Sequence, residues 1–76
     1  MTDSAALRSA IKNSGMKYGA LAERIGITAY SLQKKIDNRV EFKSSEIAKL
    51  ADILGLTGDA FNAIFFAIDG DLKSRQ

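Results

Sequence analysis

The chain has 76 residues and a formal net charge of +2, and it contains no cysteine, histidine or proline. This length is enough for one domain with one modest core. Without cysteine there are no disulfides or thiolate metal sites, and without histidine the commonest general base is missing. We therefore predict no metal and no cofactor. An enzyme is the least favoured class, because the acidic residues are scattered and no phosphate-binding glycine loop is present.

The positive charge is concentrated in the first part of the chain. Residues 8–43 include eight basic and three acidic residues, whereas residues 44–76 include three basic and five acidic ones. Such a local excess of Lys and Arg is typical of a surface that faces phosphates, although a solvated helix face would have the same charge. No basic-then-apolar leader is visible, and the longest nearly apolar stretch, residues 60–68, is too short to span a bilayer. We expect a cytoplasmic protein with no membrane partner.

Five helical patterns follow one another along the chain, separated by short breaks. In each pattern the apolar residues recur at i, i+3 and i+4, which is typical of an amphipathic helix. The predicted ranges are about 3–14, 18–25, 29–37, 44–54 and 58–67. The expected N-caps are Asp3 or Ser4, Thr28, Ser44 or Ser45, and Thr57. Glycine or asparagine follows most of these segments and favours the left-handed conformation that ends a helix (Gly15, Gly26, Asn38 and Gly55). The sequence therefore predicts an all-α fold.

The segment from Tyr18 to Lys35 is the most informative one, because it consists of two short helices joined by a glycine turn. Ala22 is small enough for a close helix crossing, and Gly26 permits the unusual backbone angles of a tight turn. The remaining apolar residues hold the second of these helices against the domain (Leu21, Ile25, Ile27, Leu32 and Ile36). This arrangement predicts a helix-turn-helix with an outward face on residues 29–37.

Polar and small residues on that outward face can contact base edges in the major groove. Glutamine pairs with adenine, lysine with guanine, and small or aromatic side chains contact the thymine methyl group. The predicted base-reading residues are Ala29, Tyr30, Gln33 and Lys34. The predicted phosphate contacts surround them (Lys17, Tyr18, Lys35, Asn38, Arg39 and Lys43). Alternatively, Lys34 and Lys35 are ordinary surface lysines and the Tyr30 ring folds onto the helix. We interpret Arg8 and Lys12, one turn apart on the first helix, as solvated.

The last helical segment carries more large apolar side chains than a small domain can easily bury. Phe61, Ile64 and Phe65 include the core-facing set by their spacing. Exposed apolar clusters usually mark an interface, so we predict a homodimer contact through Phe61, Phe65, Phe66 and Ile68. The alternative is that the C-terminal tail covers them. We assign residues 1–68 to the domain and residues 69–76 to a flexible tail.

From about Leu7 to Phe66 the chain resembles the lambda-repressor and Cro-like (XRE-type) helix-turn-helix family, which includes small regulators of temperate-phage lysogeny. The resemblance rests on the run from Leu21 to Ile27 followed by Leu32, on the loop to Phe42, and on the helix from Glu46 to Leu56. It implies a five-helix domain with the third helix in the major groove, usually as a two-fold dimer. The chain departs from the family motif at two positions: Tyr18 stands where glutamine is frequent, and Lys35 stands where an apolar residue is usual, so that Ile36 must fill that role.

These features together predict a transcriptional repressor or Cro-like switch protein that binds a short, partly palindromic operator in double-stranded DNA. The alternative is a modulator or antirepressor of the same fold that acts by binding a phage repressor protein. The modest net charge and the apolar last helix are compatible with this second class.

Overall fold

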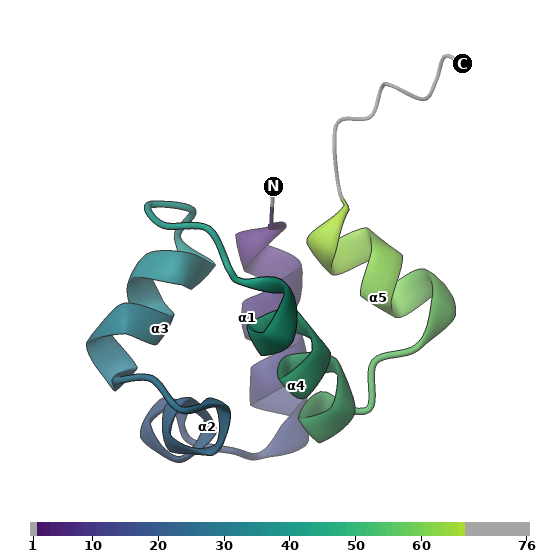
Figure 1. Cartoon of the computed structure of the whole chain (residues 1–76). Coiled ribbons are helices and arrows are strands. Elements are labelled where there is room, and N and C mark those ends of the chain that lie inside the picture. Colours follow the sequence, from purple (N-terminus) through teal and green to yellow (C-terminus); the bar gives the residue numbers. More distant parts are fainter. Residues whose placement is uncertain (1, 67–76) are drawn as a thin grey trace.

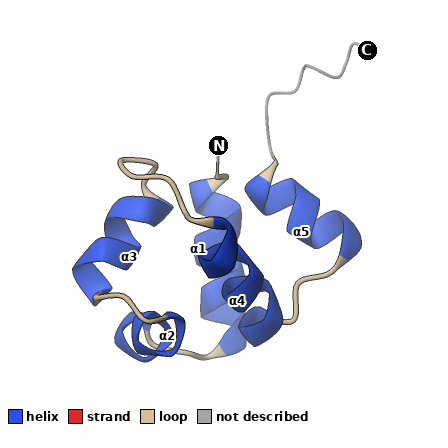
Figure 2. Ribbon diagram, viewed as in Figure 1, coloured by secondary structure: helices blue, strands red, loops and turns tan. Residues whose placement is uncertain are grey.

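The computed structural model describes residues 2–66, and within this range the chain forms helices and no strand (Figures 1 and 2). The helices are α1 (Ser4–Ser14), α2 (Tyr18–Ile25), α3 (Ala29–Ile36), α4 (Ser44–Leu54) and α5 (Gly58–Phe65). The predicted all-α, five-helix fold is confirmed, and each predicted helix lies within two residues of the observed bounds. The predicted tail, residues 69–76, lies outside the described residues.

The core is built around α1, which packs against α3, α4 and α5, while α2 packs against α3 and α4. Figure 1 shows α2 and α3 on one side of the α1–α4 pair and α5 on the other. Every one of these helices contributes at least one apolar side chain to a single buried cluster. The fully buried large side chains are Leu7, Ile11, Leu21, Leu32, Ile36 and Leu50. The helix-turn-helix is therefore held by a shared core, which fixes the outward face of α3.

The turn between α2 and α3 is formed as the sequence predicted. Gly26 adopts the left-handed conformation with a φ of 90°, and its N–H and that of Ile27 both donate to the carbonyl of Ala22. The Thr28 hydroxyl then accepts from the backbone N–H of Ser31 at 3.0 Å and caps α3. An N–H at the start of a helix has no partner within the helix, so this bond fixes where α3 begins.

The start of α4 differs from the prediction that Ser44 or Ser45 is its N-cap. The helix already begins at Ser44, and Lys43 occupies the N-cap position. A lysine side chain has no acceptor and cannot cap a helix. The carboxylate of Glu46 instead accepts from the backbone N–H of Lys43 at 2.9 Å, which is one half of a capping box. Thr57 is the N-cap residue of α5 as predicted, but its side chain makes no capping hydrogen bond.

The residues around the start of α1 connect two distant helix ends, and we call residues 2–4 the N-terminal clasp. Thr2 exchanges two hydrogen bonds with the side-chain amide of Asn38, and the Ser4 hydroxyl donates to the carbonyl of Ile36. The backbone N–H of Asp3 donates to the carbonyl of Ile64 at 2.7 Å. The clasp therefore fixes the end of α3 and the end of α5 against the start of α1.

Candidate nucleic-acid interface

The outward face of α3 begins with its first turn. Ala29 and Tyr30 are exposed, and Tyr30 keeps 74 % of its surface accessible. Leu32 and Ile36 on the opposite face are fully buried. Because the core fixes these two residues, the direction of Tyr30 follows from the helical repeat. The side chains of the first turn of α3 are thus exposed on the surface of the domain.

The other two predicted base-reading residues, Gln33 and Lys34, are half-buried rather than free. The Lys34 ammonium lies over the Tyr30 ring, 5.2 Å from its centroid, which is the geometry of a cation–π contact. The Gln33 side-chain carbonyl accepts a hydrogen bond from Nη1 of Arg8 at 3.1 Å. Both side chains therefore leave part of their surface accessible on the same side of α3 as Tyr30.

Arg8 is the residue whose role the sequence does not reveal, because its position on an amphipathic helix indicates only a solvated side chain. Its Nη2 lies 2.5 Å from Oδ1 of Asp37, and its guanidinium lies 6.0 Å from the centroid of the Tyr18 ring. The hydrogen bond to Asp37 is the main cause that raises the pKa of Arg8, and Tyr18 acts in the same direction. Arg8 thus joins α1 to both helices of the helix-turn-helix. No local pattern signals a contact between residues 25 and 29 positions apart.

The prediction that Lys35 contacts phosphate is wrong. The residue is only 6 % exposed, and its ammonium lies 2.6 Å from Oε1 of Glu46 on α4. Burial by itself would raise the pKa of Glu46, but the hydrogen bond from Lys35, the backbone N–H of Lys43 and the two lysine charges lower it on balance. Ile36 is buried as predicted, and Lys35 is buried beside it at the position where the family motif has an apolar residue.

The side chain of Asn38 also has a role other than the predicted phosphate contact. It ends α3 in the left-handed conformation as expected, with a φ of 65°. Its side-chain nitrogen, however, donates to the carbonyl of Thr2 at 2.7 Å and to the Ser4 hydroxyl at 3.3 Å. Both amide hydrogens are thus engaged in the N-terminal clasp and are not offered to a phosphate, which corrects the predicted role.

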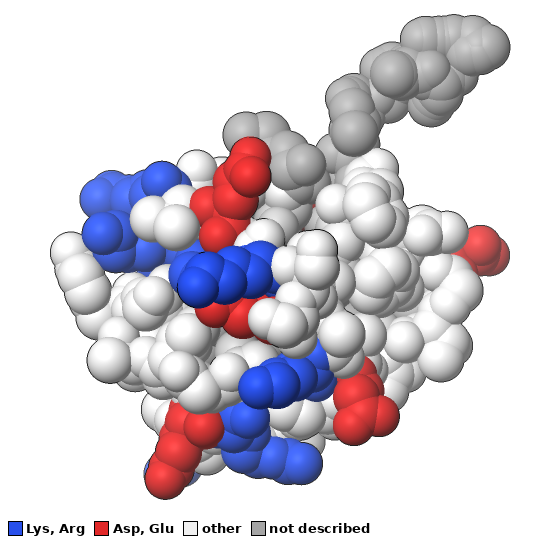
Figure 3. Space-filling view, viewed as in Figure 1, with Lys and Arg blue, Asp and Glu red and all other residues white. Residues whose placement is uncertain are grey.

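The remaining predicted phosphate contacts are compatible with that role. Lys17, Arg39 and Lys43 are exposed, and none of them forms an ion pair within residues 2–66. Tyr18 is half-buried beneath Arg8. In Figure 3 the basic side chains lie over the α2, α3 and α4 side of the molecule, whereas the surface over α5 shows no blue. This uneven charge is what a surface that faces DNA on one side requires.

The residues predicted to form the dimer contact differ in their exposure. Phe65 is 4 % exposed and stacks edge-on against Phe42 at 6.0 Å, so it belongs to the core and its assignment to a dimer interface is wrong. Phe66 is 61 % exposed, and the half-buried Phe61 lies beside it with the ring centroids 5.8 Å apart. Ile68 lies outside the described residues.

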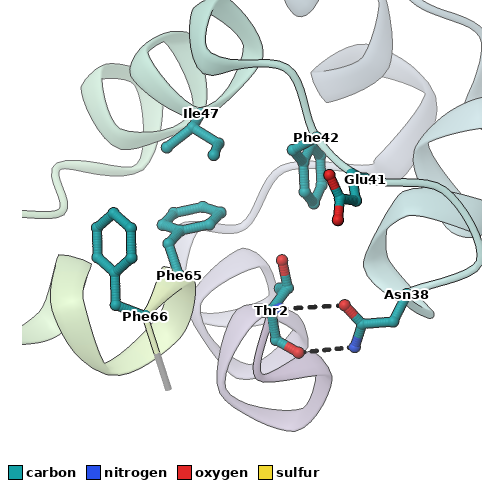
Figure 4. A pocket seen from close by; sticks show the side chains of 7 residues that line it. All are labelled: Thr2, Asn38, Glu41, Phe42, Ile47, Phe65 and Phe66. Carbon is teal, nitrogen blue, oxygen red and sulfur yellow. Dashed lines mark hydrogen bonds between the residues drawn. The ribbon is translucent and has the colours of Figure 1, made fainter. Parts of the chain in front are cut away.

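Phe66 lies at the edge of a shallow pocket with a volume of about 220 Å³ (Figure 4). The pocket is lined by Thr2, Asn38, Glu41, Phe42, Ile47, Phe65 and Phe66. Figure 4 shows Phe65 and Phe66 on one side of it, Phe42 beside Glu41 above, and the paired Thr2 and Asn38 below. The pocket therefore combines aromatic and polar walls.

Apart from the buried Glu46, the acidic side chains of the described region lie on its surface. Among residues 2–66 no group of three or more of them is placed to hold a metal ion. No described helix has the length and apolar character needed to cross a membrane.

The fold and the exposed α3 define a helix-turn-helix DNA-binding domain. A family model of the Cro/C1-type helix-turn-helix DNA-binding domain matches residues 6–62, so the chain belongs to this family. The match includes α1 to α4 and most of α5. Families of this kind are in general non-enzymatic. Neither the curated proteins nor the solved structures include a match to this chain.

Proposed function

We propose that this protein is a sequence-specific transcriptional regulator of the Cro or repressor type, which acts in the lysis–lysogeny switch of a phage in a bacterial cytoplasm. Its target is a short, partly palindromic operator in double-stranded DNA, with α3 in the major groove. The observation that carries this proposal is the exposed first turn of α3, where Tyr30 is 74 % accessible beside the partly accessible Gln33 and Lys34. Membership of the Cro/C1-type family supports the same conclusion.

In this proposal affinity and specificity come from different residues. Lys17, Arg39 and Lys43 supply positive charge to the phosphates, and this contribution weakens as the salt concentration rises. The side chains of α3 read the base edges and supply the sequence preference. A two-fold dimer would place two α3 helices about 34 Å apart, one turn of DNA. The exposed Phe66, with the half-buried Phe61 beside it, supplies the apolar contact for that dimer.

The reading face is tested by comparing Gln33→Ala with Asn62→Ala, because both substitutions remove an amide and Asn62 is exposed on α5, away from α3. An operator is first selected from random DNA with the unsubstituted protein, and binding to it and to random DNA is then measured by fluorescence anisotropy. We expect Gln33→Ala to lose about 1–3 kcal/mol for the operator only. Unchanged binding to both DNAs would show that the reading face of α3 is wrongly assigned.

A modulator that binds a repressor protein is the second candidate function, and the exposed Phe66 is the observation that favours it. A gel-shift titration with and without a candidate repressor protein separates the two functions. A regulator of the proposed type shifts the operator by itself. A shift that needs the second protein would instead identify a modulator.

A further inference from the structure

The side-chain amide of Gln33, the central polar residue of α3, is held in one orientation by a hydrogen bond within the domain. Its side-chain oxygen Oε1 accepts from Nη1 of Arg8 at 3.1 Å in a partly buried contact. Nη2 of the same guanidinium is held by Asp37 at 2.5 Å, and the Tyr18 ring lies 6.0 Å from it. Tyr18 on α2, Gln33 on α3 and Asp37 at the end of α3 thus hold the guanidinium in place.

The chemistry of arginine determines which end of the amide faces Arg8. A guanidinium group has only N–H donors and no acceptor, so it can bind only the oxygen of the amide. The NH2 group of Gln33 is then the end that is left for another partner. The amide is therefore oriented by its neighbour rather than by its own rotation.

This orientation limits the bases that Gln33 can read. A glutamine binds adenine through two bonds at once, with its oxygen accepting from N6 and its nitrogen donating to N7. Both ends of the amide must then face the base in one plane. Arg8 occupies one lone pair of Oε1 and draws this oxygen towards α1, so we take the NH2 group as the end of the amide that is offered to the groove. Guanine, which presents the two acceptors N7 and O6 there, matches this donor.

We infer that Arg8 sets the base specificity of this domain: it turns Gln33 into a donor-only reader that selects guanine over adenine. The inference rests on the proposed function, because it assumes that α3 reads DNA. Arg8 acts here as a positioning residue, since it reaches the base through Gln33. Asp37 contributes by holding the guanidinium in place.

The test compares base preferences after selection from random DNA, using the unsubstituted protein, Arg8→Met and the matched control Lys12→Met. Lys12 is exposed one turn further along α1, so its substitution removes the same charge without touching Gln33. The relevant operator position is the one whose preference disappears in Gln33→Ala. At this position we expect guanine with the unsubstituted protein and with Lys12→Met, and a shift of about tenfold towards adenine with Arg8→Met.

A second variant keeps the inference testable if Arg8→Met does not fold. In Gln33→Glu the carboxylate still binds Arg8, but the donor is lost, so the preference for guanine should disappear while the helical circular dichroism is retained. The inference alone is overturned if Arg8→Met and the unsubstituted protein select the same bases, or if the position selects adenine from the start. If the unsubstituted protein selects no sequence, the proposed function fails and this inference fails with it.

Discussion

The ammonium of Lys35 and the carboxylate of Glu46 lie 2.6 Å apart, with only 7 % and 8 % of their side chains exposed. This ion pair joins α3 to α4 through the interior of the domain. Glu46 also accepts from the backbone N–H of Lys43, so one carboxylate serves both the ion pair and the start of α4. A buried charge is tolerated only when it is paired and hydrogen-bonded, and both conditions are met here.

Removing one partner of this pair should destabilise the domain strongly. Lys35→Met leaves a buried carboxylate without its counter-ion, and we expect a loss of about 3 kcal/mol in the free energy of unfolding, measured by urea denaturation. The double variant Lys35→Met with Glu46→Gln removes both charges and keeps an acceptor for Lys43. It should recover most of the loss, because a neutral pair has no buried charge to stabilise. A double variant no more stable than Lys35→Met would contradict this account.

The same pair predicts how stability depends on pH. The pKa of Glu46 is lowered in the folded protein from its ordinary value near 4.5. A lowered folded pKa contributes stability that is fully present above the unfolded value and is lost as the pH falls through the folded one. The stability difference between the unsubstituted protein and Glu46→Gln should therefore shrink as the pH falls below 4.5. The pair between Arg8 and Asp37 is present in both proteins and cancels in this difference. A difference that stays constant down to acid unfolding would refute the prediction.

Two glycines of α2 and its turn should respond to alanine in opposite directions. A side chain at either position would meet no atom within 4 Å, so crowding does not distinguish them. Gly26 has a φ of 90°, and alanine there should cost about 1–2 kcal/mol of backbone strain. Gly19 lies within α2, and alanine there should stabilise the domain by about 0.5–1 kcal/mol. Thermal unfolding of both variants, followed by circular dichroism, checks the sign of each change.

Arg39 should contribute to DNA affinity without contributing to sequence preference. It is exposed and forms no ion pair within residues 2–66. Arg39→Ala should weaken binding to operator and random DNA alike and reduce the slope of log affinity against log salt by about one. The double variant of Lys35 and Glu46 is the control, since it keeps the net charge and should leave the slope unchanged. A reduced slope in that control would mean that Lys35 does reach a phosphate.

Phe66 should determine self-association. It is 61 % exposed and packs beside Phe61, whereas Phe65 is buried in the core. Phe66→Ser should shift the protein from dimer to monomer in sedimentation velocity while retaining its fold. Val40→Ser is the matched control, because Val40 is also exposed, at 42 %, but lies in the loop after α3. Equal sedimentation of all three proteins would argue against a dimer through Phe66.

The sequence predicts well those features that depend on neighbouring residues. The turn at Gly26, the Thr28 cap and the buried Leu32 and Ile36 each follow from a local pattern of glycine, hydroxyl or apolar spacing. For this reason the helix-turn-helix and the exposed position of Tyr30 are predictable from the amino-acid sequence alone.

The contacts that the sequence does not predict join residues far apart in the chain. Lys35 lies three residues after Leu32 and therefore points inward, but its charge suggests a surface residue. Only the acidic partner on α4 makes the buried position possible, and the helical spacing of either helix does not reveal that the two meet. The role of Arg8 escapes prediction for the same reason, since its hydrogen-bond partners lie on α3 and at its end.

The N-terminal clasp has a practical consequence for handling the protein. The second residue of the chain is bonded to Asn38 at the end of α3, and the third is bonded to Ile64 near the end of α5. An affinity tag or fusion partner added before residue 2 would be attached next to both the C-terminal end of α3 and the proposed self-association helix. Binding and assembly measurements on such a fusion would report on the attachment as well as on the domain, so an untagged protein is the appropriate reference.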